Sequence, residues 1–94
     1  MNTIWKHPFE ISDEEQLFDW YANGPIDPDT PMVTVVAMQG DKLCLWQTVH
    51  GDEKPFHFVA KVVGTGHPFD EKWAHVGTGF DQYGFVWHLL IRPA

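Results

Sequence analysis

Cysteine is almost absent from this chain of 94 residues, since Cys44 is the one cysteine in it. A framework of disulfides within the chain and a cysteine-rich metal site are therefore excluded, and a reducing cytoplasm is the expected compartment. Cys44 lies in an apolar run between two leucines, so we expect a buried, unreactive thiol rather than a nucleophile.

Long hydrophobic runs are also missing. No stretch approaches the run of about eighteen apolar residues that a membrane-spanning helix needs. Met1 is not followed by the basic segment and apolar core of a secretory signal. We therefore expect a soluble protein that acts in the cytoplasm where it is made and has no membrane partner.

Basic residues are scarce, with 6 Lys and Arg against 13 Asp and Glu and a net charge of −7. The imbalance lies near the N-terminus, because residues 1–31 hold one lysine and seven acids, a net −6. Direct nucleic-acid binding through phosphate neutralisation is not expected, because it requires clustered Lys and Arg. A basic protein surface would instead be attracted to the N-terminal third.

The chain does have abundant apolar and aromatic residues, at 44% and 15%, enough for one domain over residues 1–94 with a single core. Its most regular feature is Val-Gly-Thr-Gly, which occurs at Val63–Gly66 and again at Val76–Gly79. Glycines break or bend strands. The repeat therefore predicts a strand, a sharp corner, and a second strand with a kink at Gly77 or Gly79.

Runs of alternating and β-branched residues predict six short strands. Pro8 cannot donate to a ladder, which makes the first an edge strand, whereas the last is apolar on both faces and should be central. Gln39–Asp41 is the expected hairpin turn. The predicted fold is mainly β, a small antiparallel sandwich or half-open barrel. The expected strands are Thr3–Ile11, Met32–Met38, Lys42–Val49, Pro55–Val63, Trp73–Phe80 and Phe85–Ile91.

One short helix is expected after the first strand. Ser12–Glu15 has the S-x-x-E form of a capping box, which predicts a helix over Asp13–Tyr21 that ends at Asn23-Gly24-Pro25. Leu17, Phe18, Trp20 and Tyr21 would be available to pack inward from this helix. A proline- and aspartate-rich loop over Ile26–Pro31 should follow.

Several short motifs occur in order along most of the chain. They are Thr3-Ile4-Trp5-Lys6 with Pro8, Cys44-Leu45-Trp46, Val63-Gly64-Thr65-Gly66-His67-Pro68, Val76-Gly77-Thr78 and Phe85-Val86-Trp87-His88. With these motifs the chain resembles a family of small uncharacterised proteins encoded by phages and prophages. The resemblance implies a β-rich fold and a phage or prophage origin, and it supplies no activity. Glu14–Pro31 departs from the family pattern as a longer, acidic, aromatic insert, which makes it a candidate for target-specific contact.

Motifs that could carry chemistry favour structural roles. Gly64–Pro68 lacks the lysine of a P-loop and the third glycine of a dinucleotide fingerprint, so we expect a corner. The six histidines show neither i, i+2 nor i, i+4 spacing, although His67, His75 and His88 could meet if the C-terminal strands are neighbours. No set of nucleophile, base and oxyanion donors can be assembled. We therefore expect no metal, no cofactor and no enzymatic activity.

The insert Glu14–Pro31 is the segment that most suggests a function, because aromatic side chains surrounded by charged residues are typical of a binding surface. The alternative is that its aromatics are buried while its acids face water. We hypothesise a non-enzymatic phage or prophage accessory protein that binds a basic surface of a host protein, in a sharper form inhibiting a host defence or nucleic-acid enzyme as an acidic DNA mimic. A self-assembling, homodimeric or minor structural phage protein that uses the edge Thr3–Ile11 is the alternative. The candidate partner-binding residues are Glu14, Glu15, Phe18, Asp19, Trp20, Tyr21, Asp27 and Asp29.

Overall fold

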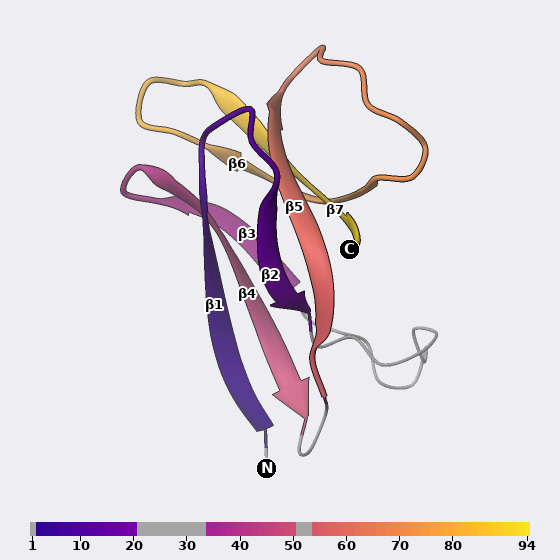
Figure 1. Ribbon diagram of the computed structural model, residues 1–94. Coiled ribbons are helices and arrows are strands. Elements are labelled where there is room, and N and C mark those ends of the chain that lie inside the picture. The colour runs from indigo at the N-terminus through magenta and orange to yellow at the C-terminus, as the bar shows by residue number, and fades with distance from the viewer. Residues whose placement is uncertain (1, 21–33, 51–53) are drawn as a thin grey trace.

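The computed structural model describes residues 2–20, 34–50 and 54–94, which form two antiparallel sheets packed face to face (Figure 1). The first sheet has the strand order β1-β4-β3 and the second the order β2-β5-β7-β6. In the first sheet the strands are β1 (Asn2–Glu10), β4 (Lys42–His50) and β3 (Thr34–Gln39). In the second they are β2 (Gln16–Trp20), β5 (Phe56–Gly64), β7 (Val86–Pro93) and β6 (Ala74–Phe80).

This arrangement confirms the predicted fold class, a mainly β antiparallel sandwich that does not close into a barrel. The strand with Pro8 is an edge strand and the last strand is central, as expected. The hairpin between β3 and β4 turns at Gly40, whose φ of 63° at the first central position is that of a type II′ turn.

The predicted helix over Asp13–Tyr21 is wrong, because the chain bends after β1 and then forms β2 within that range. The Ser12 hydroxyl accepts a hydrogen bond from the Glu14 backbone N–H at 3.1 Å, which is local turn chemistry rather than a helix cap. The Gln16 side chain then both accepts from and donates to the backbone of Glu10, at 2.8 and 3.0 Å. Non-local pairing of β2 with β5 prevails over the local capping signal.

The core lies between the two sheets and draws on both. Its fully or nearly fully buried members include Leu43 and Leu45 from β4, and Leu89 and Ile91 from β7. Alternation along β5 places Ala60 and its same-face neighbours in this core, while the opposite face carries a second cluster. That second cluster lies on the outer face of the second sheet and consists of Val59, Val63, Leu90 and Trp73, the last from the loop between β5 and β6.

Glycines in the second Val-Gly-Thr-Gly copy let β6 approach β3 closely. A Cβ built at Gly77 would lie 2.3 Å from Val36 Cγ2, and one at Gly79 would lie 2.7 Å from Leu43 Cδ1. The register also shifts between His75 and Gly77, so the expected kink is confirmed as a bulge. The bulge places His75 and Thr78 on one face of β6, although they are three positions apart in the sequence.

Candidate functional site: the aromatic end of the sandwich

Four connections gather at the end of the molecule away from the N-terminus (Figure 1). They join β1 to β2, β3 to β4, β5 to β6 and β6 to β7, and they cover residues 11–15, 40–41, 65–73 and 81–85. Binding residues are concentrated on loops that a rigid scaffold positions. This end is therefore the first place to look for a site.

Asp81 organises the hairpin between β6 and β7. Its Oδ1 accepts hydrogen bonds from the backbone N–H groups of Tyr83 and Phe85, both at 2.9 Å, and its Oδ2 accepts one from the indole N–H of Trp87 at 3.1 Å. Its backbone N–H also donates to the Phe85 carbonyl at 2.9 Å. Gly84 supplies the left-handed residue of the turn, with φ of 84°. The Asp81 carboxylate therefore supports the hairpin with three hydrogen bonds, in addition to the backbone bonds of the turn.

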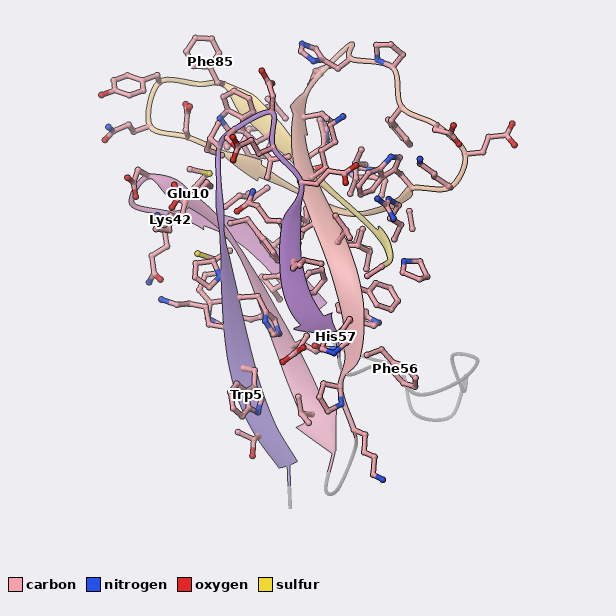
Figure 2. All side chains as sticks on the ribbon, in the orientation of Figure 1. Trp5, Glu10, Lys42, Phe56, His57 and Phe85 are labelled. Carbon is pink, nitrogen blue, oxygen red and sulfur yellow. The ribbon has the colours of Figure 1, made fainter. Side chains whose placement is uncertain are left out.

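This ordered hairpin presents three large aromatic side chains to solvent. Phe80 is 69% exposed, Tyr83 77% and Phe85 62%, and we call these three residues the aromatic tip. Figure 2 shows Phe85 pointing away from the body of the molecule. Aromatic residues are enriched at protein interfaces, and a preorganised turn lowers the entropy cost of binding through them.

A groove of about 410 Å³ lies between this hairpin and the turn that joins β3 to β4. Apolar residues from separate elements and two aspartates, Asp41 and Asp81, line it. We call it the hairpin groove. It is lined by Ile11, Met38, Gly40, Asp41, Asp81, Gln82, Tyr83 and Trp87.

The charges around the groove leave it acidic. Lys42 forms an ion pair with Glu10 (Figure 2), and the Lys6 ammonium donates to the Gln39 side chain at 2.8 Å. Desolvation acts to raise the pKa of Asp81, but hydrogen bonds from the Trp87 indole and from backbone amides of the turn outweigh it, so that pKa lies below its usual value. The nearby lysines are thus engaged elsewhere, while Asp81 stays ionised.

A network of histidines and threonines lies beside the tip, on the outer face of the second sheet. His88 bonds a threonine hydroxyl at each ring nitrogen, Thr65 at 2.8 Å from Nε2 and Thr78 at 2.9 Å from Nδ1. His75 Nε2 lies 3.0 Å from the Gly77 carbonyl and 3.1 Å from the Thr78 hydroxyl. Because a carbonyl only accepts, His75 Nε2 must carry a proton. The threonines of both Val-Gly-Thr-Gly copies thus converge on one histidine.

His67, His75 and His88, which could meet if the C-terminal strands are neighbours, all line one cavity of about 170 Å³. Their ring nitrogens do not converge on a point, however, and the described residues contain no group of three or more His, Cys, Asp or Glu side chains placed to hold a metal. The glycine corner after β5 is closed by a bond from the His67 N–H to the Gly64 carbonyl at 3.3 Å, with Gly66 at φ of 92°. It is a turn, as predicted.

The predicted partner-binding residues fall into different environments. Glu15 pairs with Arg92 at 3.1 Å, Asp19 lies 3.2 Å from His57, and Glu14 is exposed. Trp20 is buried, and Phe18 is half-buried against it, so neither ring is an exposed anchor. Leu17, expected to pack inward, is 77% exposed. Tyr21, Asp27 and Asp29 lie outside the described residues.

His7 lies behind this segment and contacts Phe18 edge-to-face, with ring centroids 5.5 Å apart. Burial lowers its pKa below the usual value, and this outweighs the opposite effects of the hydrogen bond with Gln47 and of the Asp19 charge. Gln47 is itself completely buried. The interior behind β2 therefore favours a neutral imidazole.

Sequence reasoning missed the aromatic tip. The signal was present as Phe80-Asp-Gln-Tyr83-Gly-Phe85, a turn sequence surrounded by aromatic residues. The order of residues does not show which face of β6 the other sheet covers, so the exposure of these rings could not be inferred from the sequence.

The parts of the chain that the structure describes hold no helix long and apolar enough to cross a lipid bilayer.

No curated protein and no solved structure matches the chain. A family model described as a domain of unknown function, DUF7352, matches residues 1–94, and the chain therefore belongs to the DUF7352 family.

Proposed function

We propose that this protein is a non-enzymatic binding protein that docks on a basic surface of a partner protein through the aromatic end of its sandwich. The observation that carries the proposal is the aromatic tip, three exposed rings on a hairpin that Asp81 supports with three hydrogen bonds. Preorganised aromatic anchors bind with little loss of conformational entropy. The acidic hairpin groove beside the tip and the net charge of −7 favour a basic partner.

The resemblance to small phage and prophage proteins makes a bacterial host protein the expected partner and the host cytoplasm the expected place of action. The tip replaces the acidic segment as the proposed main contact, because Glu15 and Asp19 already have partners within the second sheet. The exposed carboxylate of Glu14 remains available to steer a basic partner.

The test is capture from a bacterial lysate with two matched variants. The first variant, Tyr83→Ser with Phe85→Ser, removes two rings of the tip. The second, Leu17→Ser with Phe56→Ser, removes two exposed apolar side chains from another surface. We expect one protein to be retained by the wild type and by the second variant and lost from the first. Equal retention by all three would refute the proposed surface.

Self-assembly is a second candidate, favoured by the exposed edge of the first sheet. On edge strand β1, Ile4 is 70% exposed and Trp5 48%, and Figure 2 shows Trp5 on that strand. Unpaired edges invite pairing with a second chain. Light scattering separates the two candidates. A dimer that Ile4→Ser with Trp5→Ser converts to a monomer would support assembly, whereas a monomeric wild type supports a binder that awaits its partner.

A further inference from the structure

We propose that the hairpin groove binds an arginine side chain of the partner protein. This inference rests on the proposed function and specifies its chemistry. The groove has the size of a small ligand site, about 410 Å³, and opens at the same end as the aromatic tip. A partner that packs on the tip therefore brings its neighbouring side chains to the groove mouth.

The groove is built to receive a positive charge. Asp41 comes from the turn between β3 and β4, and Asp81 comes from the hairpin between β6 and β7, so two different turns each contribute an acidic residue to the lining. None of the described residues that line it is basic. A cation that enters would meet two acids and displace no protein cation.

The two carboxyl groups differ in what they already bind. Asp81 accepts three hydrogen bonds from its own hairpin and supplies a persistent charge. Asp41 interacts electrostatically with the neighbouring Lys42, whose ammonium is paired with Glu10, but it makes no hydrogen bond or ion pair with another side chain in the described parts of the chain. Asp41 is thus the group that can form a new bond with an incoming cation.

The walls favour arginine over lysine. Trp87 and Tyr83 line the groove, and the bond from the Trp87 indole to Asp81 fixes the orientation of the indole ring. A planar guanidinium stacks on aromatic faces and bonds carboxylates in a fork, whereas an ammonium is compact and strongly hydrated. The apolar stem of an arginine would lie against Ile11 and Met38.

The test uses the indole N–H signal of Trp87 in a nitrogen-15 NMR spectrum, because that proton is bonded to Asp81 inside the groove. The probes are three capped peptides, glycine-X-glycine, in which X is arginine, lysine or citrulline. Citrulline keeps the shape of arginine and lacks its charge. We expect the arginine peptide to shift the Trp87 signal saturably, the lysine peptide to bind several-fold more weakly, and the citrulline peptide to leave the signal unmoved.

Two variants give the matched control. Asp41→Asn removes the uncommitted carboxylate from the groove, and Glu71→Gln removes the same charge from the loop between β5 and β6. Asp41→Asn should weaken the arginine peptide about fivefold, which corresponds to about 1 kcal/mol, and Glu71→Gln should leave it unchanged. Unchanged amide signals elsewhere would show that each variant is folded.

Three results would overturn the inference: no movement of the Trp87 signal, equal binding of the citrulline peptide, or equal weakening by both variants. None of them would touch the proposed function, which the loss of the captured partner from the Tyr83→Ser and Phe85→Ser variant tests separately. If instead that variant keeps its partner while the arginine peptide binds the groove, the proposed docking surface fails and the groove stands as a site for arginine alone.

Discussion

The segment from Asp13 to Trp20 and the hairpin between β6 and β7 both combine acidic and aromatic residues, four acids in the first and Asp81 in the second, but the two kinds of side chain have opposite placements in the two regions. In the first region Trp20 is buried, and two acids pair with His57 and Arg92. In the hairpin the acid Asp81 turns inward to the backbone, and the rings turn outward.

The difference follows from where each region lies in the second sheet. β2 pairs with β5 along its whole length, and strand alternation sends Phe18 and Trp20 to the core and Asp19 to the surface. The hairpin reverses the chain at the end of β6, and its three rings are exposed. Aromatic residues near acids thus stabilise the fold in one region and are available for binding in the other.

The largest effect should come from Trp20→Ala. Trp20 packs against Phe18 and Phe58 in the core between the sheets, and removing a buried aromatic side chain costs about 3–5 kcal/mol. Urea unfolding would measure the loss. A loss of unfolding free energy below about 1 kcal/mol would mean that Trp20 does not stabilise the core, and it would contradict the proposed difference between the two regions.

Asp81→Asn should have the next largest effect, confined to the hairpin. An amide can still accept from the backbone of Tyr83 and Phe85 but places a donor against the Trp87 indole N–H. The pKa of Asp81 is lower in the folded protein than in the unfolded chain. The ionised carboxylate therefore stabilises the fold at pH values above the unfolded-state pKa, and this stabilisation is lost as the pH falls through the folded-state pKa. We expect a lower midpoint of thermal unfolding at pH 7, a shifted Trp87 signal and a flatter loss of stability below pH 4. An unchanged Trp87 signal would contradict this role.

His7→Gln should change the pH dependence near neutrality, and this effect belongs to the first region. Burial lowers the pKa of His7 in the folded protein below 6.5. At pH values between the folded-state pKa and 6.5, the unfolded chain therefore binds more protons than the folded protein does. Stability of the wild type should therefore fall as the pH is lowered from 7.5 to 5.5, and the variant should lose less over the same range. Parallel curves for both proteins would show that His7 is not desolvated.

Removing the charge of Glu15, in the first region, should reduce stability by less than the changes above. Glu15→Gln breaks the pair with Arg92, and an exposed ion pair contributes about 0.2–1 kcal/mol. Unfolding at low and high salt would measure it, because salt should remove most of the difference. A salt-independent loss would instead mark Glu15 as part of a buried network.

The smallest effect on stability should come from Tyr83→Ala at the tip. The ring is 77% exposed, and the turn uses only the backbone N–H of this residue, so the change should stay within about 0.5 kcal/mol. Urea unfolding is again the measurement. A larger loss would show that the tip is part of the core and not a surface for binding.

Much of the fold could be predicted from the sequence, because alternation and turn residues act locally. The hairpin at Gly40, the edge position of β1 and the central position of β7 each follow from such signals. The helix over Asp13–Tyr21 was wrong because Ser12 and Glu15 suit a capping box, while pairing of β2 with β5 depends on residues about forty positions later.

The candidate site was less predictable, because its parts come from separate turns. The proximity of His67, His75 and His88 could be anticipated from neighbouring strands, whereas the presence of Asp41 and Asp81 in one groove depends on how the two sheets stack. Exposure of Phe85 depends on the same stacking. The sequence shows which residues each turn contains, but it does not show which turns lie close together in the folded protein.

The most direct test of the account is the affinity of the captured partner for three proteins, measured by calorimetry at one salt concentration. They are the wild type, the variant Tyr83→Ser with Phe85→Ser, and the variant Glu14→Gln with Glu15→Gln and Asp19→Asn. Two anchor residues at about 2 kcal/mol each predict a loss of about a thousandfold for the tip variant, and the acid variant should stay within about threefold. The opposite ranking would place the binding surface on the acidic segment and contradict the account.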